Sequence, residues 1–238
     1  MKRAERHHLK ENELQRWAIQ ARGAFEDRKR ETTIGVAAIL VIGAAIAGWA
    51  GWRGYMESRA QRDLAEALGV QEARVSATGT PAAPGSFPSE RARQQAAVAK
   101  FKAAADAHPS TDAGIFARYQ EAAGQVALGN PAAAATAYQE VISRSGNGIM
   151  AQMARLGLAD AQARAGQYDQ AINTFKELAQ RKDGPLPVDG ILMQLGRTYR
   201  DAGKRADAQQ TFNRLVQEYP DSPFTSEAKR ELDALKTT

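Results

Sequence analysis

The longest apolar stretch of the chain covers residues 32–52 and reads TTIGVAAILVIGAAIAGWAGW. No residue in this stretch is charged. At about 1.5 Å per residue, a helix of this length spans roughly 30 Å, the thickness of the hydrocarbon core of a bilayer. Soluble domains of this size rarely hold so long a charge-free run in their core, so the pattern predicts a transmembrane helix.

The flanks of this predicted span differ in charge. Residues 1–31 hold nine Lys and Arg, whereas four arginines follow the span within about 20 residues. The positive-inside rule therefore predicts a single-pass membrane protein with a cytoplasmic N-terminus and an extracytoplasmic C-terminal part. Amphipathic aromatic rings favour membrane interfaces, and in this chain they mark the interface opposite the basic cluster. The residues that we place at the two interfaces are Arg28, Lys29, Arg30, Trp49, Trp52 and Tyr55.

A cleaved signal peptide is the alternative interpretation of the same stretch, because Ala45-Ile46-Ala47 resembles a cleavage site. The segment before the apolar run is more than 30 residues long, and tryptophans follow the site. Both features are typical of an uncleaved anchor, which is the interpretation that we favour.

Residues 1–31 form the predicted cytoplasmic head. Leu14, Trp17, Ala21 and Phe25 recur at helical spacing and give one apolar stripe on a charged helix. Two interpretations fit equally: an amphipathic helix on the inner leaflet or on a partner, and a charged flank that only sets topology.

The chain changes character twice after the span. Residues 53–75 have the pattern of a membrane-proximal helix, with Leu64 and Leu68 on one side. Residues 76–89 hold three prolines and two glycines, so they cannot continue a helix and are expected to form a loop.

Residues 90–238 contain an internal repeat with a period of 37 residues. Glycines, alanines and aromatic residues each recur in register, and the phase continues one period upstream. The positions are Gly129, Gly166 and Gly203; Ala134, Ala171 and Ala208; Tyr138, Phe175 and Phe212; and, upstream, Ala97 and Phe101.

Each unit has the features of a helical hairpin. The glycine tolerates the left-handed backbone that ends a first helix, and the small alanine lets a second helix pack closely. The aromatic residue lies four positions later on the same helix face and fills the space between neighbours. After Ser222-Pro223, a last helix to about Leu235 is expected to cap the stack.

This pattern resembles the tetratricopeptide repeat family. The best-matching positions are Leu192, Leu195, Gly196, Tyr199, Gly203, Ala208, Phe212 and Pro220. Glu121 and Gln162 depart from it, since an apolar and an aromatic residue are expected there. The resemblance implies an all-α protein, in which a transmembrane helix precedes an α-solenoid of stacked hairpins.

A stack of this kind has a concave surface lined by the first helix of each hairpin. In this frame we expect partner proteins to contact Phe116, Tyr119, Met153, Leu156, Met193, Arg197 and Arg200. Apolar, Met-rich surfaces suit adaptable peptide binding, and arginines bind carboxylates. For the apolar residues the alternative is packing in the core, and for the methionines and the leucine it is at least as favoured as partner binding. For the arginines the alternative is plain solvated surface.

Composition narrows the function further. The chain has no cysteine, which excludes thiol chemistry and thiolate metal sites, and its net charge of +5 sits mostly in the head. We find no catalytic pairing, metal-ligand spacing or phosphate-binding loop. We therefore expect no enzyme activity, no cofactor and no nucleic-acid partner.

The order of parts also resembles the ancillary subunit family of the bacterial Sec translocon. The head sequence ENEL (11–14), the anchor IGVAAILVIGAAIAGW (34–49) and the helix leading into the repeats carry this resemblance. It implies a place in the bacterial inner membrane with the repeats in the periplasm. It also implies association with the translocon, with periplasmic chaperones and with exported clients. Two other functions stay open: an organiser of cell division or envelope assembly, and a non-catalytic subunit of a cytochrome-maturation complex.

Overall fold

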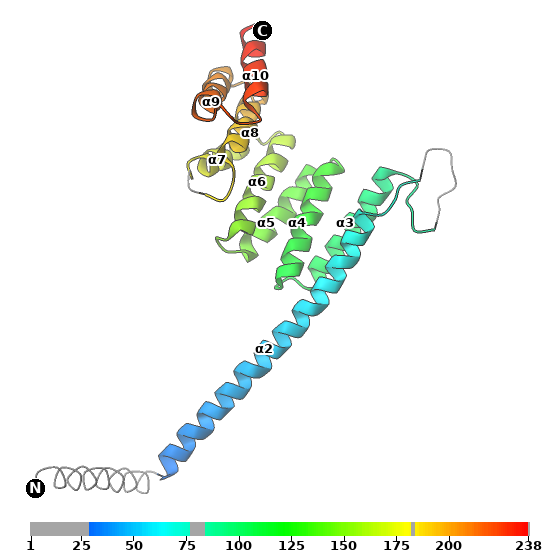
Figure 1. Cartoon of the computed structure of the whole chain (residues 1–238), viewed down its shortest axis with the longest axis vertical. Coiled ribbons are helices and arrows are strands. Elements are labelled where there is room, and N and C mark those ends of the chain that lie inside the picture. Colours follow the sequence, from blue (N-terminus) through cyan, green and yellow to red (C-terminus); the bar gives the residue numbers. More distant parts are fainter. Residues whose placement is uncertain (1–28, 77–83, 182–183, 238) are drawn as a thin grey trace, which may run out of the picture. The chain divides into compact units, whose positions relative to one another are not determined.

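The computed structural model describes residues 29–76, 84–181 and 184–237, and the expected head lies outside them except for its last three residues (Figure 1). The described part is all-α, which confirms the predicted fold class, and it consists of nine helices. They are α2 (Lys29–Gln71), α3 (Glu90–Ala107), α4 (Asp112–Ala127), α5 (Pro131–Arg144), α6 (Ile149–Arg164), α7 (Tyr168–Ala179), α8 (Val188–Asp201), α9 (Arg205–Glu218) and α10 (Thr225–Thr237).

The chain divides into two compact units, which are residues 1–55 and residues 56–238. The described part of the first unit is the N-terminal portion of α2, which is long and apolar enough to cross a membrane, and its apolar window is not buried at all. Ten of the twelve large apolar side chains exposed in the described residues lie between Ile34 and Tyr55. Arg53 stacks on Trp49, with the guanidinium 5.5 Å from the ring centroid. Water does not favour so long an exposed apolar surface, so this portion of α2 is the candidate membrane span.

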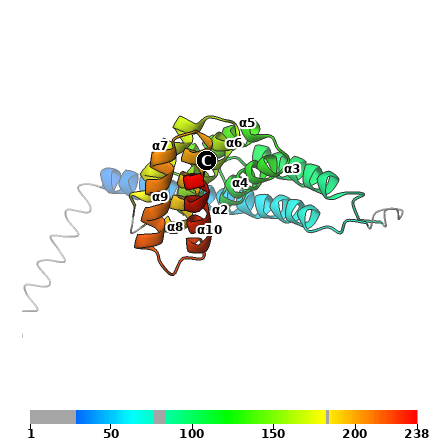
Figure 2. The same cartoon turned by 90° about the horizontal axis from the view of Figure 1, so that it is seen from above.

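The second unit is built from antiparallel helical hairpins. Helices α4 and α5, α6 and α7, and α8 and α9 form three successive hairpins, and each second helix also contacts the next first helix (Figure 2). The first helices contact one another as well, α4 with α6 and α6 with α8. Helix α10 packs against α9 and ends the described stack.

The turns within the three hairpins use the three periodic glycines. Gly129, Gly166 and Gly203 have φ of 83°, 78° and 74°, the left-handed conformation that glycine adopts without a Cβ clash. In the third hairpin, the Lys204 N–H donates to the Tyr199 carbonyl across the turn. This bond satisfies a carbonyl that the end of α8 leaves without a helical partner.

The periodic alanines and aromatic residues lie in the core. Ala134, Ala171 and Ala208 are fully buried, and Tyr138, Phe175 and Phe212 are at most 4% exposed. Phe212 of α9 packs so closely on Gly196 of α8 that a Cβ there would come within 2.4 Å of the ring. The small residues thus set how closely the two helices of a hairpin approach.

The C-terminal part of α2 pairs with α3 and completes a fourth hairpin. Ala67 of α2 shares an apolar cluster with Ala97 and Phe101 of α3, and Leu64 and Leu68 pack against it. The membrane-proximal helix was predicted to continue to Val75, but α2 ends at Gln71. Val75 instead forms an isolated β-bridge with Phe87. This bridge joins the two ends of the Pro-rich segment, whose residues 77–83 are not described.

Candidate protein-binding pocket

An apolar pocket of 340 Å³ opens among the helices of the repeat unit. Its lining comes from α4, α6, α7 and α8, from the loop before α8, and from the segment that starts the C-terminal cap. The lining residues are Tyr119, Met153, Leu156, Gly157, Asp160, Phe175, Leu186, Gly190, Gln194 and Phe224. A pocket of this size takes one or two bulky apolar side chains of a polypeptide partner.

Helical spacing places the main apolar walls. Met153 and Leu156 stand one turn apart on α6, and both stay half-buried because no neighbouring helix covers them completely. Phe175 of α7 lies behind them in the hydrophobic core. Leu186 and Phe224 add walls from segments that are distant in sequence, and both pack against the same core.

Two glycines keep the pocket open. A Cβ at Gly157 would lie 2.4 Å from the Tyr138 ring, so the glycine lets α6 approach this ring closely. A Cβ at Gly190 would lie 3.4 Å from the Phe224 ring. Larger residues at these two positions would displace an aromatic ring or occupy space beside it.

The polar groups of the pocket are few. Asp160 pairs with Arg164 one turn later at 2.8 Å, and Gln194 and the Tyr119 hydroxyl complete the set. The Tyr119 hydroxyl is protonated at neutral pH and can donate a hydrogen bond, and burial raises its pKa further above the ordinary value. This arrangement suits an apolar side chain flanked by peptide-bond groups.

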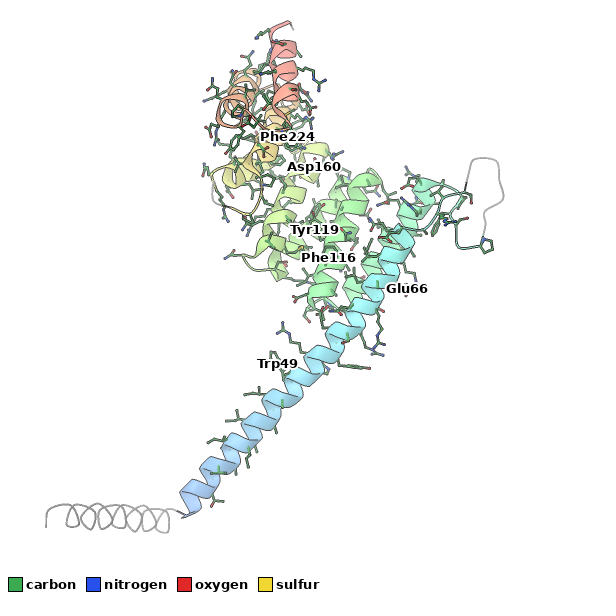
Figure 3. The ribbon with its side chains drawn as sticks, viewed as in Figure 1. Trp49, Glu66, Phe116, Tyr119, Asp160 and Phe224 are labelled. Atoms are coloured by element: carbon green, nitrogen blue, oxygen red, sulfur yellow. The ribbon has the colours of Figure 1, made fainter. Side chains whose placement is uncertain are left out.

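The structure brings together three of the seven residues predicted to bind partners. Tyr119, Met153 and Leu156 line the pocket. Phe116 stacks beside Tyr119 on α4, with ring centroids 6.4 Å apart, and does not line it (Figure 3).

Met193 requires a correction, because it is only 1% exposed and cannot contact a partner. It belongs to the apolar cluster of the C-terminal hairpin, against which Phe224 and Leu232 pack. The alternative of core packing holds at this position, since the C-terminal cap adds a layer beyond α8.

The two predicted arginines are occupied within the chain, which is a second correction. Arg197 pairs with Glu227 of α10, and Arg200 pairs with Glu231 of α10 at 2.6 Å. They do bind carboxylates, as guanidinium chemistry predicts, but these carboxylates belong to the capping helix. The arginines therefore attach α10 to α8.

Sequence reasoning missed several pocket residues. Gly190 and Gln194 lie one 37-residue period after Met153 and Gly157, so a strict use of the period would have found both. Leu186, in the loop before α8, and Phe224, just before α10, follow no such rule. Their place in the pocket depends on how the loop and the cap fold back, which the period does not encode.

A family model for the tetratricopeptide repeat-like domain matches residues 29–236. The chain belongs to this family. The matched range starts at the first residue of α2 and so includes the candidate membrane span as well as the repeats of this tetratricopeptide repeat-like protein. No curated protein matches the sequence.

Solved structures show the same fold. Two crystal structures of nearly identical TPR-like repeats, from a protein described as a kinesin light chain of Podosopora anserina, superpose with TM-scores of 0.58 and 0.57. Each is 14% identical to this chain in sequence. The matched region covers 75% of this chain in both cases, and 85% of the first solved chain and 86% of the second. At this identity the likeness extends to the fold alone.

Proposed function

We propose that this protein is a non-catalytic scaffold, anchored in the bacterial inner membrane by α2, that binds other polypeptides in the periplasm. Its binding site is the apolar pocket around Leu156, which takes bulky apolar side chains of the bound segment. The finer proposal is that it serves newly exported proteins at the Sec translocon. The order of parts supports this role, since a basic head, an anchor and a repeat domain follow one another as in the translocon's ancillary subunits.

One observation carries the binding proposal: the repeat unit leaves this apolar pocket open while covering nearly all its other large apolar side chains. Among the described residues after Tyr55, only Val75 and Ile149 are large, apolar and exposed, and both are single residues. An open apolar concavity in an otherwise polar surface is the usual character of a binding site. Fully burying one Leu or Phe of a partner contributes about 1.5–3 kcal/mol, which suits weak binding of many clients.

Photocrosslinking tests the proposal directly. A photoreactive amino acid at Met153 should crosslink exported polypeptides or translocon subunits in intact membranes. The same group at Ile149, which is exposed on α6 outside the pocket, is the matched control. Capture at Met153 of neither class would refute the translocon role, while capture of division or haem-handling proteins would support the corresponding alternative.

A charge in the pocket should abolish binding. Leu156→Glu places a carboxylate against apolar walls and is expected to weaken client binding at least about tenfold, the equivalent of roughly 1.4 kcal/mol. Ile149→Glu adds the same charge to the same helix and should leave affinity unchanged. Fluorescence anisotropy with an unfolded client peptide measures both, and equal losses in the two variants would contradict the assigned site.

A further inference from the structure

The apolar pocket around Leu156 has aromatic as well as aliphatic walls. Tyr119 of α4, Phe175 of α7 and Phe224 before α10 each contribute a ring, and Met153 adds a thioether (Figure 3). We propose that this pocket selects aromatic side chains of a bound polypeptide over aliphatic side chains of equal size. The inference rests on the proposed function, because it names the class of side chain that the same site takes.

Aromatic walls distinguish a bound ring from an aliphatic group of the same volume. The face of a ring is negative and its edge is positive, so aromatic pairs adopt stacked or edge-to-face contacts. Such pairs strengthen an interaction about two- to tenfold beyond the burial of apolar area. The Met153 sulfur adds a favourable contact of its own with a ring. An aliphatic side chain gains the burial and none of these contacts.

Two of the three rings are held in place before a partner binds. Tyr119 packs edge-to-face on Tyr138, with ring centroids 5.6 Å apart and an interplanar angle of 64°, and it also stacks on Phe116. Phe175 is only 1% exposed and is fixed in the core. Binding therefore loses little free energy to the ordering of these side chains.

Backbone hydrogen bonds position Phe224, the third ring. Its N–H donates to the Ser222 hydroxyl at 3.1 Å, and its carbonyl accepts from the Ala228 N–H at 2.8 Å in the first turn of α10. Gly190 leaves this ring uncovered, since its absent Cβ would lie 3.4 Å from the ring, in van der Waals contact. A ring of the partner can occupy that space instead.

Rings that carry a hydrogen-bond donor also fit this lining. In the described part of the chain, the side-chain amide of Gln194 has no hydrogen-bond partner, although the Gln194 backbone carbonyl accepts from Thr198. The amide oxygen can accept the indole N–H of a tryptophan or the hydroxyl of a tyrosine, so neither donor is buried unpaired. The selected class therefore consists of Phe, Tyr and Trp side chains.

Methionine-methyl NMR on the full-length chain in phosphatidylcholine nanodiscs tests this selectivity. The probes are two Gly- and Ser-rich peptides that differ only in their central residue, which is phenylalanine in one and cyclohexylalanine in the other. Cyclohexylalanine is similar in size to phenylalanine and at least as apolar, but it has no π system. The Met153 methyl resonance, assigned with Met153→Leu, reports on the pocket, and the methyl of Met56, which lies on α2 outside it, is the internal control.

The phenylalanine peptide should shift the Met153 resonance saturably, with a dissociation constant at least about twofold below that of the cyclohexylalanine peptide. Phe224→Leu and, separately, Tyr119→Leu each remove a ring and keep an apolar wall, so they should bring this ratio toward one. The matched control is Tyr168→Leu. Tyr168 is half-buried against the same core cluster as Phe224 but lies outside the pocket, so the ratio should stay unchanged.

The outcomes separate selectivity from binding, once circular dichroism has verified that every variant is folded. A ratio reduced in either pocket variant and kept in Tyr168→Leu supports the proposal. Equal dissociation constants, tighter binding of cyclohexylalanine, a ratio unchanged in both pocket variants, or an equal reduction in the control would each overturn aromatic selectivity and leave the apolar binding site standing. No shift of Met153 with either peptide would refute the binding site itself, and the selectivity with it.

Discussion

Glycines have three different roles in this protein. The backbone conformation and the space around the absent Cβ distinguish them. Gly203 adopts a left-handed turn, Gly196 makes room for a ring, and Gly69 meets nothing within 4 Å of its absent Cβ. A substitution to alanine should therefore have a different effect at each of the three. The repeat pattern included Gly203 and Gly196. It did not indicate whether each glycine is needed for a left-handed backbone or for the space that a side chain would fill.

Gly196→Ala and Gly69→Ala form a matched pair of opposite sign. At Gly196 the added methyl group meets the Phe212 ring at 2.4 Å, so the free energy of unfolding should fall by about 1–3 kcal/mol through overpacking. Gly69 lies inside α2, and nothing is near its absent Cβ. Alanine there should raise the free energy of unfolding by up to about 1 kcal/mol through its higher helix propensity. Urea unfolding of the repeat unit measures both, and a destabilised Gly69→Ala chain would contradict this reasoning.

At the scale of elements, the sequence predicted most helices because their period, turn glycines and core alanines are local signals. Charged residues in the core were not predicted, because their pairing combines contacts within one helix with contacts from neighbouring helices. Glu121 is the clearest case: it stands where an apolar residue was expected, and it is buried against Arg118 at 2.6 Å. Gln162 likewise replaces an expected aromatic residue and donates from Nε2 to Gln170 Oε1 at 3.2 Å.

Arg118 joins three helices through carboxylates. This buried guanidinium of α4 pairs with Asp106 of α3, Glu121 of α4 and Glu140 of α5. Hydrogen bonds from Lys102 and Arg118 lower the pKa of Asp106 from its ordinary 3.8, while burial raises the pKa of Glu121. The two carboxyl groups thus contribute to the pH dependence of stability with opposite signs.

Asp106→Asn should remove an acid-sensitive part of the stability. Because the folded pKa is lowered, the stabilisation by Asp106 is complete above the unfolded value near 3.8 and is lost as pH falls through the lower folded value. The difference in unfolding free energy between wild type and Asp106→Asn should therefore be largest near neutral pH and shrink toward pH of about 3. Urea titrations across this range test it, with Asp169→Asn, which breaks an exposed pair with Lys204, as control. A difference that does not vary with pH would refute this interpretation.

The hairpin of α2 and α3 makes the C-terminal part of α2 a component of the repeat unit as well as a continuation of the anchor. A fragment of residues 56–238 keeps Leu64 and Leu68 over Phe101, whereas residues 90–238 lose them and expose the apolar face of α3. Each lost leucine costs about 1.5–3 kcal/mol, and each kcal/mol shifts Tm by about 2–4 °C in a domain of this size. The shorter fragment should therefore melt roughly 10 °C lower, or aggregate, in a thermal scan. Equal Tm values for the two fragments would show that α2 contributes nothing to the repeats.

At the scale of the whole molecule, the proposed function depends on which side of the membrane each part occupies. Charge counts predict the head inside and the repeats outside. The same counts also set the environment of the apolar pocket, since exported clients are available only to a periplasmic repeat unit. Topology is therefore the prediction on which the others depend.

The absence of cysteine makes this topology measurable with single introduced thiols. Ser226→Cys lies on the exposed face of α10, and Gln20→Cys lies in the head. In spheroplasts, a maleimide that cannot cross the membrane should label Ser226→Cys at once and label Gln20→Cys only after detergent is added. The untouched chain, which has no thiol, gives the background. Labelling of both cysteines in intact spheroplasts would mean that the head has crossed the bilayer, and labelling of neither would place the repeats in the cytoplasm. The second result would remove the periplasmic clients from the proposed function and leave the apolar pocket with a cytoplasmic partner, whereas the first would keep the repeats in the periplasm and refute only the predicted cytoplasmic head.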